Sequence, residues 1–189
     1  AFHGHRRLCR RGRGTDITLS DHQFSHVCNM VAAAGLDSRV DFHLRDYRDQ
    51  THHFDKIVSV GMLEHVRPQG YASYFAKIRA LIADDGIAVI HTIGVQHKAG
   101  PVNRWITKYI FPGGYLPSIG QMIRHTETRG LNLLDMEVMR GHYAETLRLW
   151  RMQFLDRRAE MRRLYDARFV RMWEFYLVGC EYFFRRQHG

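Results

Sequence analysis

Cysteine is scarce in this 189-residue chain, which has only Cys9, Cys28 and Cys180. Such an odd, unclustered set argues against a disulfide framework or a cysteine zinc site and fits a reducing cytoplasm. No apolar run approaches the roughly 20 residues needed to span a bilayer, and the arginine-rich N-terminus lacks the apolar core of a signal peptide. We therefore expect a cytoplasmic protein, with a length that suits one domain and a substantial core.

Net charge is missing from the middle of the chain, although the whole chain carries +9. Residues 1–16 hold five arginines and one aspartate for a net +4, and residues 140–189 hold eleven arginines and six acids for +5. A basic surface can meet nucleic acid or an anionic membrane, but more commonly it is only a solvated helix face. The neutral middle argues against a nucleic-acid groove at the sheet.

Regular periodicity is absent from residues 1–14, so over about 1–16 we expect a disordered basic tail, or sequence that does not belong to the fold. His3 and His5 have no further ligand at metal spacing, so no metal site is expected. The remaining sequence predicts strands over 15–19, 39–44, 55–60, 86–93 and 131–138. It predicts helices over 20–34, from 68 onward, over 118–129 and over 145–186.

The expected helix ends rest on local residue preferences. Ser20 and Gln23 form a capping box, and Gly35 is the expected stop of that helix. Pro68 opens the next helix, where its missing N–H is harmless, and the residues at 84–86 are expected to turn the chain. Strands that alternate with helices in this way predict an α/β fold, with a parallel sheet and helices on both faces.

One stretch, Phe54–His65, organises the chain. Its β-branched run predicts a strand buried in a parallel sheet, and it stops at a glycine. Ligands of open α/β sheets bind beyond the carboxyl ends of the strands, which is where Glu64 and His65 follow. The alternative is a solvated Glu-His pair at a strand end, which position alone would favour.

A second predicted strand ends in His91-Thr92-Ile93, so two parallel strands present polar side chains at the same edge. Residues 95–117 form an irregular insertion rich in glycine, proline and aromatic residues. A connection of this length inside a compact domain is usually functional or mobile.

Together these motifs resemble the cyclopropane-fatty-acyl-phospholipid synthase family, which includes the mycolic acid cyclopropane synthases. The resemblance spans about residues 17–186 and rests on several blocks in the same order: Ile17-Thr18-Leu19-Ser20 with Gln23, Val58–His65, His91-Thr92-Ile93, Tyr109–Pro117, His142–Leu147 and Arg171–Leu177. It implies a class I methyltransferase fold of Rossmann-like type. It also implies an acyl-binding insertion over 95–117 and a helical C-terminal part over 143–186.

The resemblance implies S-adenosylmethionine as cofactor. The cofactor contacts that it implies are Thr18, Leu19, Gln23, Asp46, Tyr47, Gly61 and His65. It further implies a bound bicarbonate held by Glu64, His91, Tyr143 and the Ile93 backbone. Residues that resemble the wall of an acyl-chain tunnel are Phe111, Gly114, Tyr115 and Leu116.

These residue types suit the chemistry that the family performs. Methyl transfer from a sulfonium to an olefin leaves a carbocation, and ring closure then needs a proton removed from the new methyl group. A bicarbonate can take that proton if His91 and Tyr143 donate hydrogen bonds to it and Glu64 accepts its hydroxyl. Alternatively, Tyr143 is an aromatic packed on the core at a helix start, and His91 is a core histidine at a strand end.

The expected function is formation of cyclopropane rings on unsaturated acyl chains of membrane phospholipids. Two alternatives remain: an acyl-lipid methyltransferase that stops at a methyl branch or hydroxyl, and a non-catalytic basic module that binds nucleic acid. The expected location is the inner face of the membrane, held by anionic lipid through the basic ends. No nucleic-acid partner is expected, and a homodimer stays open.

The sequence also departs from the family pattern. The glycine-rich cofactor loop and the strand before it should precede Thr18 but are absent, and Gly12-Arg13-Gly14 does not replace them. The family cysteine that helps hold bicarbonate and the last antiparallel strand are missing as well. The chain therefore resembles a fragment with an incomplete sheet. We expect it to be inactive, poorly stable and open at two inner strand edges, where strands 15–19 and 55–60 lack the strand between them.

Overall fold

The computed structural model describes residues 12–96 and 99–186, so most of the predicted basic tail, with His3, His5 and Cys9, lies outside the described residues. The chain divides into two compact units. The first comprises the described residues up to Gly100 together with Tyr115–Leu131, and the second comprises Pro101–Gly114 and the described residues from Asn132 onward.

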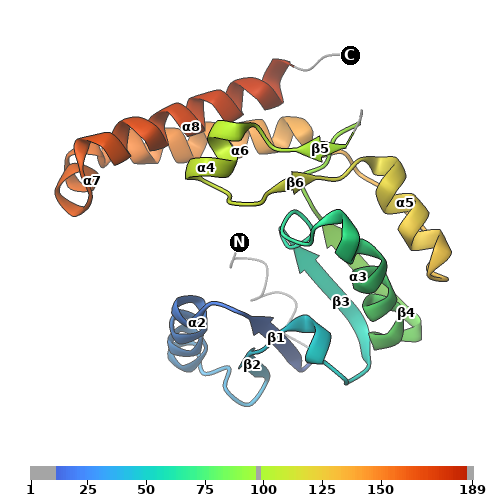
Figure 1. The fold of residues 1–189 in the computed structure, drawn as a ribbon. Helices are drawn as coiled ribbons and strands as arrows, with labels where there is room; N and C mark the ends of the chain where they lie inside the picture. The colour runs from blue at the N-terminus through green and yellow to red at the C-terminus, as the bar shows by residue number, and fades with distance from the viewer. Residues whose placement is uncertain (1–11, 97–98, 187–189) are drawn as a thin grey trace. The chain divides into compact units, whose positions relative to one another are not determined.

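The first unit mixes short strands with helices (Figure 1). In chain order its elements are β1 (Gly14–Thr18), α2 (Asp21–Ala33), β2 (Val40–Leu44), the 3-10 turn η1 (Tyr47–Asp49), β3 (Phe54–Val60), α3 (Pro68–Leu81), β4 (Ile82–His91), β6 (Tyr115–Leu116) and α5 (Ile119–Thr128). A further two-residue strand, β5 (Gly100–Pro101), lies at the boundary of the units. The predicted α/β fold is confirmed.

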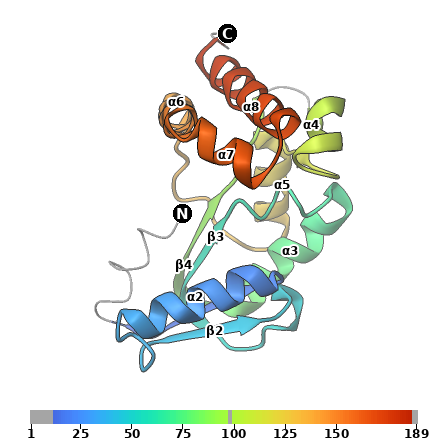
Figure 2. The same cartoon turned by 90° about the vertical axis from the view of Figure 1, so that its left-hand side faces the viewer.

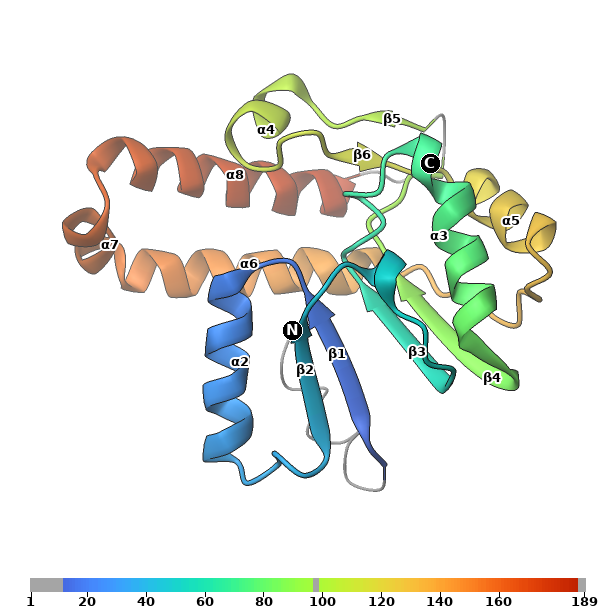
Figure 3. The same cartoon turned by 60° about the horizontal axis from the view of Figure 1, so that its bottom comes forward.

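Two parallel ladders take the place of one continuous sheet. β1 pairs with β2 from Gly14↔Val40 to Thr18↔Leu44, and β3 pairs with β4 from Lys56↔Ile87 to Val60↔His91. In the described part of the chain no ladder joins β1 to β3, and Figure 3 shows the two pairs as separate ribbons. The sheet is therefore interrupted at the place where the sequence predicts a missing strand.

The helix ends largely follow the predicted local chemistry. Ser20 Oγ accepts a hydrogen bond from Gln23 N at 3.3 Å, as predicted. The second bond of the predicted capping box, from Ser20 N to the Gln23 side chain, is wrong. Ser20 N donates instead to Thr18 Oγ1, which itself donates to Gln23 Oε1 at 2.8 Å. Gly35 ends α2 with a φ of +63°, a left-handed conformation that glycine adopts without strain. α2 then packs along β2 (Figure 2).

The β3–β4 ladder is buried on one face only. Ile57, Ala88 and Ile90 pack against a core of Leu63, Tyr71, Tyr74, Phe75 and Ile78, most of it from α3. On the other face Val58, Val60, Ile87 and Val89 are 51%, 59%, 51% and 54% exposed. The prediction that Val58 and Val60 are buried is therefore wrong, since in the described chain no element covers this face, whereas parallel sheets normally have helices on both.

Two further sequence predictions are wrong in the first unit and at its border. The expected turn at 84–86 lies inside β4, where the register jumps from Phe54↔Ile82 to Lys56↔Ile87, so the extra residues form a bulge. The expected strand over 131–138 has no regular structure. Extended backbone becomes a strand only by pairing, and no neighbouring strand is found for this segment among the described residues.

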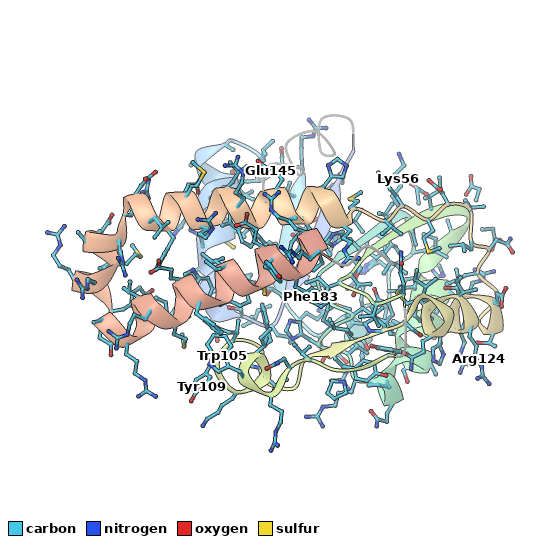
Figure 4. The ribbon with its side chains drawn as sticks, turned by 90° about the horizontal axis from the view of Figure 1, so that it is seen from above. Lys56, Trp105, Tyr109, Arg124, Glu145 and Phe183 are labelled. Atoms are coloured by element: carbon cyan, nitrogen blue, oxygen red, sulfur yellow. The ribbon has the colours of Figure 1, made fainter. Side chains whose placement is uncertain are left out.

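The second unit is helical: α4 (Arg104–Tyr109), α6 (Arg140–Asp156), α7 (Arg158–Leu164) and α8 (Ala167–Arg186). The predicted irregular insertion thus contains a helix, which Asn103 caps by accepting from Trp105 N at 2.8 Å. The predicted continuous helix over 145–186 is also wrong, because the backbone leaves helical geometry at Arg157 and Tyr165. Figure 4 shows Trp105 and Tyr109 on α4, and Glu145 and Phe183 on the paired helices α6 and α8.

The pair of α6 and α8 has its own core of Leu147, Phe154, Val170, Tyr176 and Leu177. Glu181 is buried between these helices, where it accepts from Arg151 Nε at 2.8 Å and Arg185 Nε at 3.1 Å. These arginines, Arg151 above all, lower the pKa of Glu181. None of the helices in the described ranges is both long and apolar enough to cross a membrane.

Hydrogen exchange should reveal the interrupted sheet. Amides on the open edges of β1 and β3 lack ladder partners, so we expect residues 54–60 to exchange at least about tenfold faster than residues 170–181 in α8. Mass spectrometry of peptic peptides measures this difference. Equal protection of both segments would show that another segment completes the sheet.

Buried tyrosines make the fold sensitive to alkali. Burial raises the pKa of both Tyr71 and Tyr74 to about 12, against an ordinary value of 10.0, with a smaller contribution from the nearby Glu64. The unfolded chain therefore loses these protons at a lower pH than the folded chain, so the contribution of these two tyrosines to stability should be constant below pH 10 and fall between about 10 and 12. Tyr74→Phe should weaken this dependence in urea titrations, whereas Tyr165→Phe, at an exposed position, should leave it unchanged.

Candidate active site

Two parallel strand ends, those of β3 and β4, form the centre of the candidate site. Gly61 follows β3 with a φ of +64°, which favours glycine, and its N–H donates to the His91 carbonyl at 3.0 Å. This bond keeps the two strand ends together. The turn that follows buries Leu63 completely and brings Glu64 back toward the end of β4.

Glu64 is the most constrained of the predicted catalytic residues. Its Oε1 accepts from the Ile93 N–H at 2.6 Å, and its own carbonyl accepts from Tyr115 N at 3.2 Å. Its Oε2 is buried and has no hydrogen-bond partner among the described residues. The alternative of a solvated Glu-His pair is therefore wrong for Glu64, because one oxygen is held in place while the other is available to a donor.

Tyr71 is a polar neighbour that sequence reasoning missed. Its side chain is fully buried, its hydroxyl has no partner in the described chain, and both Tyr115 and Glu64 contribute to its raised pKa. Its ring meets those of Tyr115 and His125 edge-on, with centroids 6.3 and 5.9 Å apart. The sequence motifs did not single it out, although a hydroxyl one turn into the helix after Glu64 could have identified it.

The two predicted histidines lie at exposed positions of the same strand ends. His91 is the last residue of β4 and is exposed, so the alternative of a core histidine is wrong. His65 is also exposed, next to Glu64 in the turn after β3. The structure thus brings together the Glu64 carboxylate, the Ile93 amide and the β4 end that carries His91.

The predicted ribose and methionine contacts follow β1. Thr18 and Gln23 are joined by the 2.8 Å hydrogen bond between their side chains, which lies at an exposed position. Leu19, between the strand and α2, is 72% exposed. Polar groups and one apolar side chain are therefore available to a ligand at this strand end.

The predicted adenine contacts follow β2. Both carboxylate oxygens of Asp46 accept hydrogen bonds from Arg48, at 2.7 to 3.0 Å, and these bonds lower the pKa of Asp46. Tyr47 is half-buried and meets the Tyr74 ring edge-on, with centroids 5.8 Å apart. Tyr47 is thus fixed by the core, whereas Asp46 is held by an exposed arginine.

The four predicted acyl-chain residues are divided between the units. Tyr115 and Leu116 form β6 in the first unit, and Tyr115 Oη contacts Gln121 at 3.3 Å. Phe111 and Gly114 belong to the second unit, where the Phe111 ring lies 6.1 Å from that of Tyr176. Gly114 is buried in a tight turn, and a Cβ there would lie 3.2 Å from the Phe111 carbonyl oxygen.

Tyr143 also belongs to the second unit, near the start of α6. Its ring packs against Phe184, with centroids 4.8 Å apart, and against Trp150 at 6.4 Å. This packing agrees with the alternative of a core aromatic at a helix start. A role for Tyr143 in holding bicarbonate stays a prediction.

A metal centre finds no support in the part of the chain that the structure describes. No group of three or more His, Cys, Asp or Glu side chains there is arranged to hold an ion. The chemistry available at the strand ends is that of a fixed carboxylate, two imidazoles and backbone amides. Such groups can orient an anion or a proton acceptor.

Known proteins resemble both the sequence and the fold. The chain is 43% identical over 189 residues to the tuberculostearic acid methyltransferase UfaA1 of Mycobacterium tuberculosis, covering 94% of this chain and 44% of that protein. It is 42% identical over 151 residues to the cyclopropane-fatty-acyl-phospholipid synthase of Escherichia coli K12, covering 80% and 39%. The chain thus spans less than half the length of these curated relatives.

A solved structure extends the resemblance to the fold. The mycolic acid cyclopropane synthase CmaA1, solved in complex with SAH and CTAB, superposes with a TM-score of 0.83 at 27% identity, covering 92% of this chain and 65% of that chain. The family model for mycolic acid cyclopropane synthetase matches residues 12–188. With this match over nearly all of its length, and with the strand-end residues described above, the chain belongs to the mycolic acid cyclopropane synthetase family.

Proposed function

We propose that the protein containing this chain transfers a methylene from S-adenosylmethionine to the cis double bond of unsaturated acyl chains in membrane phospholipids and forms a cyclopropane ring. The observation that carries this proposal is the Glu64 carboxylate, with one oxygen held by the Ile93 amide and the other buried without a partner. In a member of this family, such an acceptor suits the hydroxyl of a bound bicarbonate.

The residues at the ends of β1 and β2 fit S-adenosylmethionine in part. Thr18 and Gln23 offer hydroxyl and amide groups to the polar side of the cofactor, and the half-buried Tyr47 offers an aromatic face to its adenine. The cofactor supplies a methyl group on a sulfonium. The glycine-rich loop that would hold its carboxylate is not present in this sequence.

Ring closure explains why the carboxylate must be fixed. After methyl transfer to one olefinic carbon, the neighbouring carbon carries the positive charge. The new methyl group loses a proton, and its C–H electron pair closes the ring onto that carbon. A bicarbonate held by Glu64 and His91 would accept this proton, while the Ile93 amide holds the Glu64 carboxylate in place. A misplaced acceptor leaves the cation to other reactions, since geometry is the first requirement of a general base.

A second candidate is methyl branching of acyl lipids, favoured by the 43% identity to a protein named tuberculostearic acid methyltransferase. Both reactions share the methyl donor and the acyl chain up to the cation. Proton loss from the cation gives a ring or an alkene and water gives a hydroxyl, whereas a saturated methyl branch also needs a hydride from a separate reductant. Proton NMR of lipids from cells that express the longest reading frame containing this chain distinguishes a ring methylene from a methyl branch or a hydroxyl. Unchanged lipids would contradict both candidates.

Cofactor affinity tests the assignment at β1 and β2. Gln23→Ala with Asp46→Ala removes two polar contacts, each worth about 0.5–1.5 kcal/mol, so calorimetry should show S-adenosylmethionine affinity lowered about tenfold or more. His22→Ala with Asp49→Ala, at neighbouring exposed positions, is the matched control. Equal affinity of both double variants would refute this placement.

Glu64→Gln tests the catalytic assignment. The amide keeps the shape and an oxygen for the Ile93 N–H, but it replaces the second acceptor with a donor, so the rate of ring formation should fall by about 10²–10³. S-adenosylmethionine affinity should stay unchanged, and Glu127→Gln on α5 should retain full activity. Ring formation at the wild-type rate by Glu64→Gln would show that the role is wrong.

A further inference from the structure

An open groove lies where α6, α7 and α8 meet in the second unit. Its volume is about 470 Å³, within the roughly 300–1,000 Å³ of ligand-binding pockets. Apolar side chains from all three helices form most of its lining, together with polar groups at the end of α6: Trp150, Phe154, Met161, Trp173, Leu177, Gln153, Asp156 and Arg157. None of these residues is among those predicted to contact the acyl chain in the reaction.

The groove continues into an aromatic row along α8. Tyr165 stacks on Phe169, with centroids 4.2 Å apart, and Phe169 stacks on Trp173 at 6.0 Å. Tyr165 itself is 59% exposed, next to Leu164 at 65%. Large apolar side chains thus lead from the groove to the turn between α7 and α8, which lies at one end of the helix pair (Figures 1 and 3).

The same end of the helix pair is strongly basic. Residues 157–168 hold five arginines and two acids, a net +3. Arg158 pairs with Glu174 at 3.1 Å, but Arg157, Arg162 and Arg163 are exposed and form no ion pair among the described residues. Asp156 at the groove offsets only one of these charges. An apolar groove beside unpaired arginines complements an anionic amphiphile.

From this combination we propose that the α6–α7–α8 groove is a docking site for an anionic phospholipid of a bilayer. One acyl chain lies in the groove and the phosphate meets Arg157, while Leu164 and Tyr165 enter the interface. The proposal rests on the proposed function only in naming a phospholipid membrane as the partner. A second copy of this chain is a poorer occupant, because the +3 segments at 157–168 of the two copies would repel each other. Nucleic acid is also a poorer occupant, because it would leave the apolar groove empty.

Vesicle binding by the longest reading frame that contains this chain tests the charges. Arg157→Gln with Arg162→Gln and Arg163→Gln should weaken binding to vesicles of phosphatidylcholine and phosphatidylglycerol about a hundredfold at low salt, at about fivefold per charge. The control is Arg104→Gln with Arg124→Gln and Arg129→Gln, all exposed, which should bind like wild type. Equal binding by the two triple variants, or equal binding of wild type to vesicles of phosphatidylcholine alone, would overturn the proposal.

The groove has a test of its own. Phospholipid with brominated acyl chains should quench Trp150 and Trp173, and Met161→Gln, which places an amide in the groove, should reduce this quenching while the exposed Met136→Gln does not. No quenching in wild type would overturn the acyl site. If circular dichroism shows that Met161→Gln loses helix, the arginine triple variant, which changes only exposed side chains, decides alone.

Three outcomes separate this proposal from its competitors and from the catalytic proposal. If the protein binds a DNA duplex more tightly than anionic vesicles, and if salt weakens this binding and the arginine triple variant abolishes it, the proposal is overturned in favour of nucleic acid. A lipid-independent change in tryptophan emission with protein concentration would overturn it in favour of a second copy. Retained methyl transfer to detergent-dispersed phospholipid by a triple variant that no longer binds vesicles would support docking as a step separate from catalysis.

Discussion

The hydrogen bond from the Ile93 amide to Glu64 Oε1, at 2.6 Å, is the contact on which the candidate site depends. It connects the turn after β3 with the segment after β4. The bond from Gly61 N to the His91 carbonyl joins the ends of the same two strands. Because Oε1 already accepts a hydrogen bond, the buried Oε2 is the oxygen left without a partner among the described residues. A carboxylate fixed in this way pays little reorganisation when a transition state forms, which is the usual source of electrostatic catalysis.

The interrupted sheet explains the uneven burial of the first unit. α3 covers one face of β3 and β4 with a core of Leu63, Tyr71 and Tyr74, so this half is packed. The opposite face exposes Val58 and Val89, and the β1–β2 ladder stands apart from β3. Each strand pair has its own helix, with α2 on β2 and α3 on β4.

The helical unit is stabilised independently of the sheet. Leu147 and Leu177 are buried between α6 and α8, and the buried Glu181 holds Arg151 and Arg185. A buried carboxylate is favourable only when such partners compensate its desolvation. The ion pair of Glu181 with Arg151 holds α6 and α8 together. The end of the helix pair at α7 carries the arginines and the exposed apolar side chains, and there we propose the membrane contact.

The sequence by itself determined the α/β class, most element positions, the Ser20 and Gly35 helix ends and the placement of Glu64, His91 and Ile93 at strand ends, because periodicity and end preferences are local. The tertiary structure decided which faces are buried. It exposed Val58, left residues 131–138 unpaired, broke the last helix at Arg157 and Tyr165, and left the buried Tyr71 hydroxyl without a hydrogen-bond partner among the described residues. Burial, pairing and hydrogen-bond partners depend on residues distant in the chain, and no local pattern contains them.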